Sequence, residues 1–353
     1  MKINVTEFSG KNRNEWIRYL RKNPNSTIYH TPEWRNFAEK IGYEPLYFVA
    51  RNIDAQLLGI FPIFIAKSIS GKKAVSIPLR DGGGPIGDSE EVLSEMYKMT
   101  IRKIEERNLK YLEVKNHSGL KKTNEESLGI TRKNDLIRSV ITLEGNPEAM
   151  WKKLHKKSFQ WAVKKAVKEG VREKWAESEE ELKAFHEMFM NTRKKLGVPG
   201  YPYFYFQNMW ECLKDNGYMK VLLAVYKEKC VSGIVMLLYG DKVIYAYAGS
   251  DSSFLHLRPN NFALWKAIEW STLNGYLYFD MGSDSPHSKG LMGFKARSGA
   301  KQKKTVYSYY LNKVENIVPF DPDDPKYILA KKVIRRMPIG CLKFISHFIY
   351  KYV

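Results

Sequence analysis

The chain has 353 residues, of which 44% are hydrophobic and 13% aromatic, so it can build cores of ordinary size and is not a disordered chain. A chain of this length favours two domains of roughly 150 residues each. The 58 Lys and Arg residues outnumber the 38 Asp and Glu residues and give a formal net charge of +20 at pH 7, which favours polyanionic partners or an anionic membrane face.

Cysteine content and hydropathy indicate the cellular compartment in which we expect the protein. Cys212, Cys230 and Cys341 are odd in number and lack metal-type spacing, so neither a disulfide framework nor a zinc site is indicated and a reducing cytoplasm fits best. The first residues are polar, and no apolar run approaches the roughly 18 residues of a membrane span. We therefore expect a cytoplasmic protein that neither carries a secretory signal peptide nor crosses a bilayer.

Two β-rich stretches, residues 48–65 and 222–239, resemble each other. Each reads as a strand, a polar turn and an apolar strand, which predicts a β-hairpin. A helical pattern and another strand follow both hairpins, over residues 97–116 and 264–283. This order, repeated about 170 residues apart, predicts two copies of one α/β domain, with chance similarity of hairpins as the alternative. The matched positions are Ala50 with Ala224, Gly59 with Gly233, Ile60 with Ile234, Ile101 with Ile268, Tyr111 with Tyr278, and Glu113 with Asp280.

The boundary between the two copies should fall near residue 145, where turn residues precede a helix that can start at Pro147. The predicted domains are residues 1–145 and 146–320. A basic stretch follows the boundary, because residues 152–174 contain nine Lys or Arg residues and two Glu residues, a net charge of +7.

Residues 321–353 form a third predicted part, a basic C-terminal tail. From residue 326 onward the tail carries seven Lys or Arg residues and no acidic residue. Apolar residues recur at helical spacing after Pro338, which predicts a basic amphipathic helix. Such a helix can dock on the anionic cytoplasmic leaflet of a membrane, or it can pack on the second domain with its lysines outward. The recurring apolar residues are Leu342, Ile345, Phe348 and Ile349.

Six segments in this order and spacing resemble the FemAB-like family of peptidyl and aminoacyl transferases, a branch of the GNAT acyltransferase superfamily. The resemblance covers nearly the whole chain. It implies an α/β acyltransferase with two tandem GNAT-like domains followed by the basic helical tail, and we expect neither a cofactor nor a metal. The segments are YHTPEWRNFAEKIG (29–42), IPLRDGGGPIGD (77–88), LHKKSFQWAVKKAVKEGV (154–171), RPNNFALWKAIEW (258–270), YFDMGS (278–283) and GLMGFKARSGA (290–300).

The resemblance also assigns residues of the first domain. Trp34 and Lys40 match the aromatic residue and the lysine that frame the acceptor cleft in the family. The family's Gly-Pro turn with an acidic residue close behind it is represented by Gly84 and Asp88. We therefore expect these four residues to lie near the acceptor.

The basic helix of the second domain departs from the family pattern. The family usually has an Arg after the Lys-Lys-Ser/Thr of this helix, and here Phe159 occupies that place. The nearby lysines can still act as point charges toward phosphate groups, so we expect a basic helix that is aimed differently. The lysines concerned are Lys156, Lys157, Lys164 and Lys165.

Amide-forming acyl transfer needs an amine nucleophile, a group that takes its proton and a positive group near the carbonyl oxygen. Lys295, which forms the family's Phe-Lys pair with Phe294, is the candidate for the positive group, and the alternative is a lysine in a basic surface loop. Asp81 and Asp88 flank a triple-glycine turn and are the candidates for proton removal; the alternative is a turn that needs positive φ. Asp280 follows an apolar strand and either faces the ligand or caps the residues after it.

The loop before the second-domain helix bears on the acyl donor. In CoA-dependent members of the superfamily this loop carries Arg or Gln and then spaced glycines whose amides bind pyrophosphate. Here the loop contains Arg258, a candidate substrate-binding residue, but Pro259 has no N–H group and no glycine lies between Phe254 and Lys266. We therefore expect aminoacyl-tRNA rather than CoA as the donor, and the net charge of +20 suits tRNA.

The sequence thus predicts an enzyme that forms an amide between an aminoacyl group carried by tRNA and an amine of a cell-wall peptide precursor. We expect it in the cytoplasm, or peripherally on the inner face of the membrane through its tail. The alternative enzyme is a GNAT-type N-acyltransferase that uses acyl-CoA or an acyl carrier on an envelope polysaccharide or amino sugar. A third hypothesis is a catalytically silent module that binds tRNA or a membrane.

Overall fold

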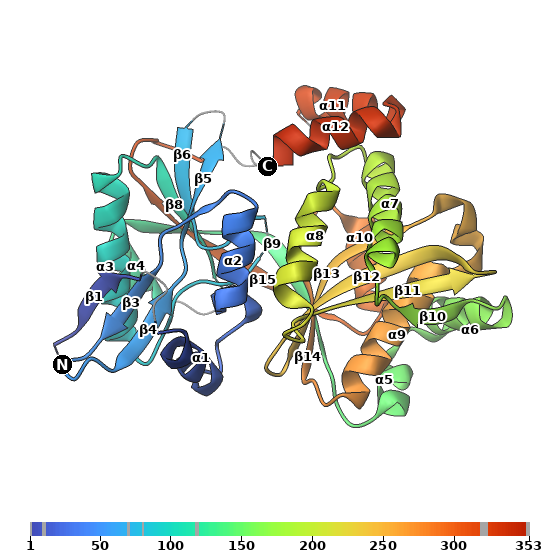
Figure 1. Cartoon of the computed structure of the whole chain (residues 1–353), viewed down its shortest axis with the longest axis horizontal. Helices are drawn as coiled ribbons and strands as arrows, with labels where there is room; N and C mark the ends of the chain where they lie inside the picture. Colours follow the sequence, from blue (N-terminus) through green and yellow to red (C-terminus); the bar gives the residue numbers. More distant parts are fainter. Residues whose placement is uncertain are drawn as a thin grey trace. The chain divides into compact units, whose positions relative to one another are not determined.

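The computed structural model describes residues 2–8, 12–68, 71–79, 81–116, 120–317 and 324–350, and Figure 1 shows the course of the chain. The chain forms two compact units. Unit 1 comprises Met1–Leu136 and Lys304–Pro319, and unit 2 comprises Ile137–Lys303 and Phe320–Tyr350. Two strands, β9 (Ile130–Thr142) and β15 (Lys301–Leu311), contribute residues to both units. The sequence-based division at residues 145 and 320 stays a prediction.

Unit 1 contains two groups of paired strands. The first is an antiparallel sheet in the order β1-β3-β4-β7. In the second, β8 pairs in parallel with β6 and antiparallel with β15, while β5 pairs with β6 and β2. The strands are β1 (Asn4–Glu7), β2 (Glu44–Pro45), β3 (Phe48–Arg51), β4 (Leu57–Phe61), β5 (Phe64–Ser68), β6 (Gly71–Val75), β7 (Ile86–Gly87) and β8 (Tyr111–Asn116).

The longest helix of unit 1 covers its first sheet. It begins after Ser89, whose hydroxyl accepts a hydrogen bond from the Val92 N–H group at 3.3 Å, and it packs on β3 and β4. A Cβ atom at Gly59 in β4 would lie 2.8 Å from both Val92 Cγ1 and Met96 Cε, so this close approach requires glycine. The helices of unit 1 are α1 (Arg13–Lys22), η1 (Ile28–His30), α2 (Pro32–Lys40), α3 (Glu90–Glu106) and α4 (Lys122–Ser127).

Unit 2 is built on a sheet in the order β10-β11-β12-β13-β14-β9. All its strand pairs are antiparallel except β13 with β14, which is parallel. Strands β11 and β12 are long and mostly buried, as expected for strands of a sheet covered on both faces. The strands not yet given are β10 (Arg172–Trp175), β11 (Met219–Tyr226), β12 (Lys229–Tyr239), β13 (Lys242–Ser250) and β14 (Tyr278–Asp284).

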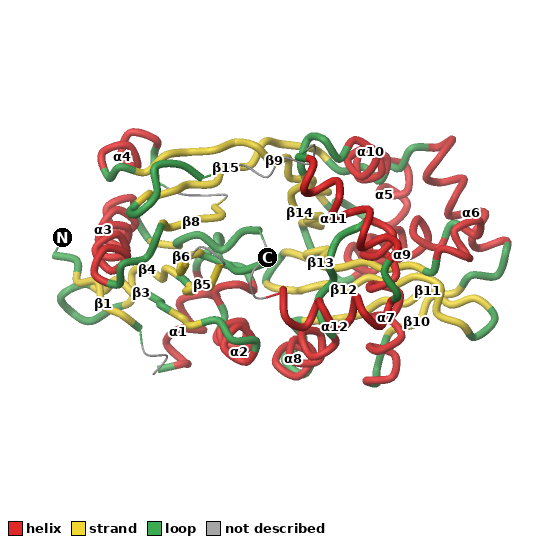
Figure 2. The backbone as a smooth tube through the Cα atoms, turned by 90° about the horizontal axis from the view of Figure 1, so that it is seen from above, coloured by secondary structure: helices red, strands yellow, loops and turns green. Residues whose placement is uncertain are grey.

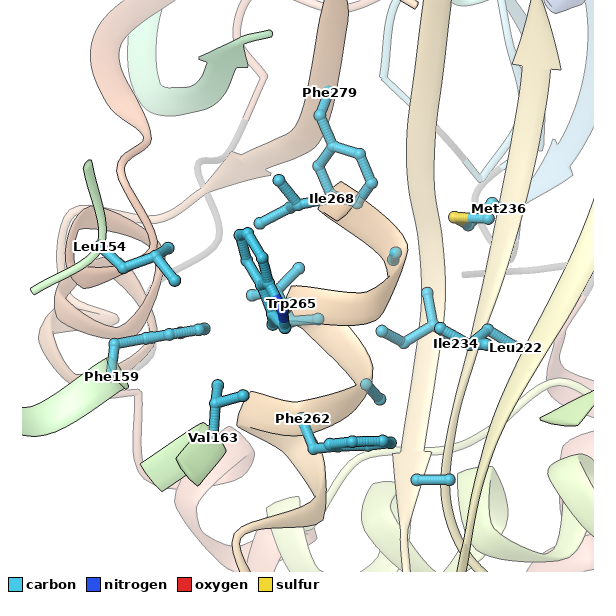
Figure 3. Packing of buried hydrophobic residues seen from close by; sticks show 14 of the residues in the cluster. Leu154, Phe159, Val163, Leu222, Ile234, Met236, Phe262, Trp265, Ile268 and Phe279 are labelled. Carbon is cyan, nitrogen blue, oxygen red and sulfur yellow. The ribbon is translucent and has the colours of Figure 1, made fainter. Parts of the chain in front are cut away.

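Helices cover the two faces of this sheet. Ile234 of β12 points into a core that includes Trp265 of α9, and Figure 3 shows this packing. Gly233, the preceding residue, faces the other side, where a Cβ atom would lie 2.8 Å from Phe185 of α7. The helices are α5 (Pro147–Lys153), the π-helical η2 (Lys156–Gln160), α6 (Trp161–Lys168), α7 (Glu179–Leu196), α8 (Tyr203–Leu213), η3 (Ser252–Leu257), α9 (Pro259–Leu273), α10 (Lys289–Arg297), α11 (Pro325–Arg336) and α12 (Ile339–Ile349).

The predicted duplication is confirmed. The two predicted hairpins are β3–β4 and β11–β12, and in each the register shifts directly after the matched alanine, Ala50 or Ala224. A helix, α3 or α9, follows each hairpin and packs on it, and then a strand, β8 or β14, pairs in parallel with an earlier strand. The chain therefore contains two α/β units that share the order hairpin, helix and parallel strand.

The predicted tail is helical. It forms α11 and α12, and α12 begins directly after Pro338. Both helices contact α7, and Figure 2 shows α12 beside α7. Among the described residues, no helix combines the length and the hydropathy that a membrane span requires. The tail therefore packs on unit 2, as one of the two alternatives expected.

Candidate active site

A short parallel ladder marks the candidate site in unit 2. Strands β13 and β14 pair only through Lys242–Ile244 and Tyr278–Asp280. Beyond this ladder β13 continues to Ser250 and β14 to Asp284. On its other side β14 pairs with β9 both along the ladder and through its last residues, Ser283 and Asp284. The two parallel strands therefore stop bonding to each other halfway along. Backbone and side-chain groups at this point can bind other partners.

Lys295 lies at the end of this ladder. It comes from α10, the helix that follows β14, and its side chain is only 4% exposed. Its ammonium group donates a hydrogen bond to the Met281 carbonyl oxygen and forms an ion pair with Asp284 Oδ2 at 2.6 Å. Lys295 is therefore a buried, fixed positive group rather than a lysine of a surface loop.

Asp280 forms a second ion pair on β14. Its carboxylate accepts hydrogen bonds from Arg138 Nε at 3.1 Å and Arg138 Nη2 at 2.5 Å, and its Oδ1 also accepts one from the Gly282 N–H group at 2.9 Å. The bidentate geometry holds both side chains in place. Two roles were expected for Asp280, and the hydrogen bond from the Gly282 N–H group is the capping role. Whether Asp280 also contacts a ligand stays a prediction.

Three residues near Lys295 and Asp280 were not identified from the sequence: Asp284, Arg138 and Tyr245. Burial, and then the negative charge of Asp284, raises the pKa of the Tyr245 phenol, which stays protonated at neutral pH. The one sequence signal for Asp284 was its place four residues after Asp280 on the same strand. Arg138 and Tyr245 come from other strands, so only the folded sheet brings them together.

Phe294, the partner in the Phe-Lys pair, packs against Phe159. Their ring centroids are 5.6 Å apart, and Phe159 is almost completely buried in the core of unit 2. Figure 3 shows Phe159 pointing into this core with Val163 and Leu154. The Phe that replaces the family's Arg is thus a core residue, and a charged side chain in its place would lose its solvation. Phosphate contacts from this helix must come from its lysines.

The lysines of the basic helix surround an exposed aromatic ring. Trp161, the first residue of α6, is 49% exposed. The Arg258 guanidinium lies 5.3 Å from the centre of the ring and Lys165 Nζ lies 5.8 Å from it, distances at which a cation is attracted to an indole. The residues that line a pocket of about 440 Å³ here are Lys156, Lys157, Gln160, Trp161 and Lys164. Sequence reasoning did not identify Trp161, although it lies within the quoted basic segment.

Local structure explains the outward direction of these lysines. On α6, Ala162, Val163 and Ala166 are buried, and the helix packs on α9. This narrow apolar stripe leaves Lys164 exposed on the opposite side. Arg258 directly precedes α9 in a left-handed backbone conformation with φ of 61°.

Unit 1 contains a separate polar pocket of about 720 Å³. Asp88 lines it, and its Oδ1 accepts a hydrogen bond from the Tyr19 hydroxyl at 3.0 Å. Burial and the nearby Asp88 charge raise the pKa of Tyr19, which therefore remains a donor. Arg18 and Lys22 add positive charge to the lining. The pocket lining is Glu15, Arg18, Tyr19, Lys22, Asn23, Pro24, Asn25, Gln56, Leu57, Gly87 and Asp88.

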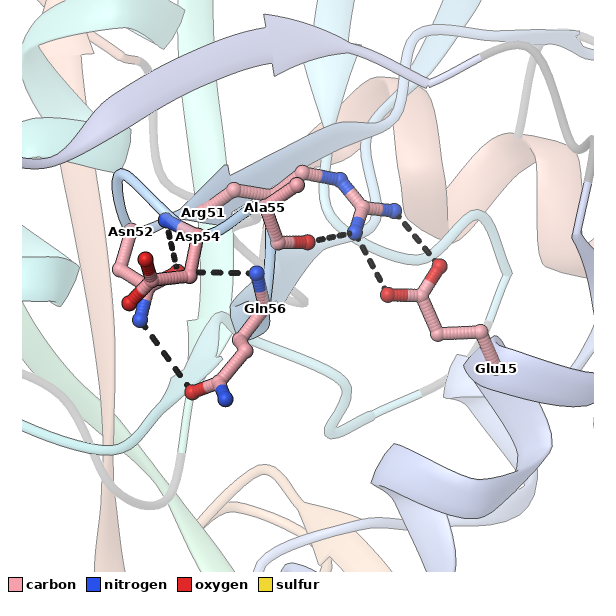
Figure 4. Close-up of polar contacts among 6 residues, drawn as sticks. All are labelled: Glu15, Arg51, Asn52, Asp54, Ala55 and Gln56. Atoms are coloured by element: carbon pink, nitrogen blue, oxygen red, sulfur yellow. Dashed lines mark hydrogen bonds and ion pairs between the residues drawn. The ribbon is translucent and has the colours of Figure 1, made fainter.

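The wall of this pocket is held by an ion pair. Arg51 Nη1 and Nη2 donate to the two carboxylate oxygens of Glu15 at 2.5 and 2.8 Å, and Nη1 also donates to the Ala55 carbonyl oxygen at 2.6 Å (Figure 4). The hydrogen bond from Arg51 lowers the pKa of Glu15. Asn52 Oδ1 accepts hydrogen bonds from the Gln56 N–H group at 2.9 Å and from the Asp54 N–H group at 3.0 Å. These contacts tie α1 to the β3–β4 turn.

Asp81 and the triple-glycine turn contact other residues than Asp88 does. The Tyr307 hydroxyl donates a hydrogen bond to Asp81. Gly83 has φ of 77°, and a Cβ atom there would lie 2.3 Å from Ile77 Cγ1. His30 Nε2 bonds to the Gly84 carbonyl oxygen at 2.8 Å. The turn thus needs positive φ, as the alternative stated, and a buried histidine holds it.

Trp34 and Lys40 differ in exposure. Trp34 is almost completely buried, with edge-on contacts to Tyr29 and Phe37 at centroid distances of 4.7 and 5.1 Å. Lys40 is exposed at the end of α2. Their assignment to an acceptor cleft stays a prediction.

The predicted site residues thus fall into two sets. One is in unit 2, around the β13–β14 ladder and the basic helix, and the other is in unit 1. No group of three or more His, Cys, Asp or Glu side chains suited to a metal ion occurs within the described ranges. The first set is Lys156, Lys157, Lys164, Lys165, Arg258, Asp280, Phe294 and Lys295, and the second is Trp34, Lys40, Asp81, Gly84 and Asp88.

A family model described as an acetyltransferase (GNAT) domain matches residues 155–295. The chain carries a GNAT domain. The matched segment begins at the basic helix and ends at Lys295, so it includes the site residues of unit 2 described above except Arg138. This GNAT domain makes the protein an acyltransferase. A comparison with curated protein sequences gives no significant match.

Solved structures extend the similarity to both units. The crystal structure of FemX has a TM-score of 0.72 with 14% identity and covers 93% of this chain and 100% of its own. The C-terminal domain of a protein assigned as a lysylphosphatidylglycerol synthetase from Agrobacterium fabrum has a TM-score of 0.56 with 9% identity, covering 92% and 97%. A tandem GNAT protein from the clavulanic acid biosynthesis pathway has a TM-score of 0.51 with 6% identity, covering 87% and 98%. The chain therefore has a FemAB-like fold of tandem GNAT-like units.

Proposed function

We propose that this protein transfers an aminoacyl group from aminoacyl-tRNA to an amine of a cell-wall peptide precursor. The observation that carries the proposal is the content of the GNAT domain. It holds a buried, oriented ammonium group, Lys295, and within the same 155–295 segment a basic surface around Trp161. The basic surface would bind an anionic polynucleotide donor, and Lys295 would contact the acyl carbonyl.

The reaction places a defined demand on Lys295. The acceptor amine attacks the ester carbonyl carbon, a C–N bond forms, and the C–O bond to the tRNA ribose breaks while the ribose oxygen takes a proton. Negative charge builds on the carbonyl oxygen in the transition state, and a fixed N–H donor stabilises it. Asp284 and the Met281 carbonyl hold the ammonium group in one place. Lys295 can therefore stabilise this oxyanion without reorganising.

The start of α9 supports tRNA rather than CoA as the donor. Pro259 occupies the first position of the helix and has no N–H group. The Asn260 side chain accepts a hydrogen bond from Ser232 Oγ at 2.7 Å and donates one to Ser250 Oγ at 3.3 Å, which ties the helix start to β12 and β13. The glycine-rich pyrophosphate loop of CoA-dependent enzymes is absent from the sequence here.

The polar pocket of unit 1 is our candidate for the acceptor site. Arg18 and Lys22 would attract an acidic precursor, and Asp88, which also lines the pocket, is the carboxylate predicted from the sequence for proton removal. Asp81 is the second candidate base, although Tyr307 occupies one of its oxygens. The reaction would take place in the cytoplasm or at the inner face of the membrane, where the tail would make contact.

The direct test is a transfer assay with purified protein, a pool of charged tRNAs and wall precursors, with products identified by mass. We expect one or a few amide products whose mass rises by one amino-acid residue. The control is the same pool after the aminoacyl esters are hydrolysed, which should give no product. Absence of product with every charged tRNA would contradict the proposal.

A CoA-dependent N-acyltransferase is the second candidate, because the matching family model describes an acetyltransferase domain. It would modify an amino sugar or an envelope polysaccharide. Titration calorimetry with CoA separates the two candidates: the tRNA proposal expects no tight binding, and tight binding that competes with acyl transfer would favour the CoA-dependent enzyme.

A further inference from the structure

The two tail helices are anchored to unit 2 by specific contacts. At α11, a Cβ atom on Gly197 of the α7 C-terminus would lie 2.8 Å from the Lys331 carbonyl oxygen, so the two backbones touch. At α12, Leu342 and Ser346 are fully buried, and Ser346 Oγ accepts a hydrogen bond from the Gly200 N–H group at 3.3 Å. Phe204 also makes ring contacts with the tail. These contacts fix which side of each helix faces outward.

Large apolar side chains lie on the outward sides. None of the α11 residues is buried. On α12, Phe344 lies two residues from Leu342, about 200° around the helix, and so points away from the anchor. Phe344 and Phe348 are four residues apart with ring centroids at 5.0 Å. The most exposed apolar side chains of the tail, between 50% and 67% exposed, are Leu329, Val333, Phe344 and Phe348.

Positive charge surrounds these apolar side chains. Lys332 follows Leu329 by three residues, and Arg336 follows Val333 by three residues, so each cation neighbours an apolar residue on the surface of α11. Residues 325–350 contain no Asp or Glu. The basic residues of the two helices are Lys326, Lys331, Lys332, Arg335, Arg336 and Lys343.

We propose that α11 and α12 form a docking surface for an anionic lipid bilayer. The four exposed apolar side chains enter the boundary between headgroups and acyl chains, and the basic residues bind lipid phosphates in the headgroup layer. Charge complementarity selects this occupant. A second copy of the tail would oppose six positive charges with six more, whereas anionic lipids neutralise them. The proposal stands independently of the acyl donor and of the transfer reaction.

The test is flotation of the full-length protein with vesicles of phosphatidylcholine alone and of phosphatidylcholine mixed with phosphatidylglycerol. We expect binding only to the mixed vesicles, weakened by salt because the attraction is partly electrostatic. The double variant Lys332→Ala/Arg336→Ala should lower the partition coefficient about fivefold per removed charge. The double variant Phe344→Ala/Phe348→Ala should lower it about tenfold or more at unchanged charge.

The matched control is Ile53→Ala/Leu273→Ala, two residues that are 77% and 68% exposed elsewhere on the chain. It should leave vesicle binding unchanged, and circular dichroism should show all three variants folded. Three results would overturn the proposal: no binding of the unmodified protein to mixed vesicles, equal binding by the tail variants, or a lipid-free dimer that Phe344→Ala/Phe348→Ala dissolves. Transfer to a water-soluble acceptor should be the same for all variants, so failure of this proposal is distinct from failure of the transferase.

Discussion

The short helix after the last matched strand differs between the two units, although both units share the order hairpin, helix and parallel strand. In unit 1 this helix is α4, and it buries Glu125 at 1% exposure. In unit 2 it is α10, and it buries Lys295 at 4% exposure. The corresponding helix thus buries an acidic residue in one unit and a basic residue in the other.

The surroundings of these two charges differ as well. Glu125 forms an ion pair with Arg132 and accepts a hydrogen bond from Ser308 Oγ at 2.7 Å. Its partners therefore come from β9 and β15. Lys295 instead contacts β14, at the point where the β13–β14 ladder ends. The two units therefore bury different ion pairs after their matched strands, and the one in unit 2 contains the ammonium group that we propose as the oxyanion donor.

The largest expected effect comes from Lys295→Ala. Turnover of the folded protein should fall about 100-fold or more, because a fixed donor to the oxyanion is lost. Stability should also fall, by roughly 3–5 kcal/mol, because Asp284 is left buried without its cation. Transfer kinetics and urea unfolding measure the two effects separately. Turnover equal to that of the unmodified protein would remove Lys295 from the mechanism.

Two further variants sharpen this comparison between units. Lys295→Ala/Asp284→Asn removes both charges and should recover much of the lost stability but none of the lost turnover. Glu125→Gln breaks the corresponding pair in unit 1 and should lower stability while the folded fraction keeps its turnover. Loss of turnover per folded molecule in Glu125→Gln would mean that both buried charges serve the reaction.

The second prediction concerns the basic surface, which belongs to unit 2. Trp161→Ala should weaken binding of single-stranded RNA by about 1–3 kcal/mol if a base stacks on the indole, without changing the salt dependence of binding. Lys156→Ala/Lys157→Ala should instead reduce that salt dependence, because two phosphate contacts are lost. Fluorescence anisotropy over a salt series tests both. An unchanged affinity for Trp161→Ala would show that the ring packs only against Arg258 and Lys165.

The third prediction uses the two matched hairpin glycines. Gly59→Ala and Gly233→Ala each introduce a Cβ atom 2.8 Å from a packed side chain, so each should destabilise its own unit by about 1–3 kcal/mol. Hydrogen exchange resolves which unit opens. Gly340→Ala is the control for crowding, because no atom lies within 4 Å of its Cβ position and its φ is not positive. If only one of the two matched variants is destabilised, the hairpins pack differently despite their shared pattern.

The smallest effect is expected from a pH change near 6.5, through a histidine of unit 2. Burial lowers the pKa of His186 on α7 below its ordinary value of 6.5, although its hydrogen bond to the Tyr201 carbonyl opposes this shift. The unfolded chain then binds more protons than the folded one as pH falls below about 6.5. Stability is therefore present above that pH and declines through the lower folded pKa. Thermal unfolding of His186→Gln should lack this decline, and an identical decline would contradict the assignment.

Several site features were predictable because they rest on local sequence. The matched alanines and glycines located both hairpins, since strand alternation and turn residues act over a few positions. The basic character of the α6 segment was visible in the sequence, because residues 152–174 contain nine Lys or Arg residues. The departure at Phe159 was also visible in the sequence, but its cause, packing against Phe294, was not.

Residues that depend on contacts between distant strands were missed. Asp284 is the partner of Lys295, Arg138 pairs with Asp280 across 142 sequence positions, and Tyr245 lies on a third strand. The burial of Trp34 and the hydrogen bond from the Tyr307 hydroxyl to Asp81 likewise follow from packing and not from a motif. Spacing within one segment contains no information about such partners.

The amino-acid order by itself determined the repeated α/β units, the basic helix and the helical tail, because periodicity, turn residues and charge act over short distances along the chain. Only the tertiary structure decided which charges are buried and what they face. Burial depends on all the elements that close around a side chain, and so the corresponding helices of the two units bury Glu125 in one and Lys295 in the other.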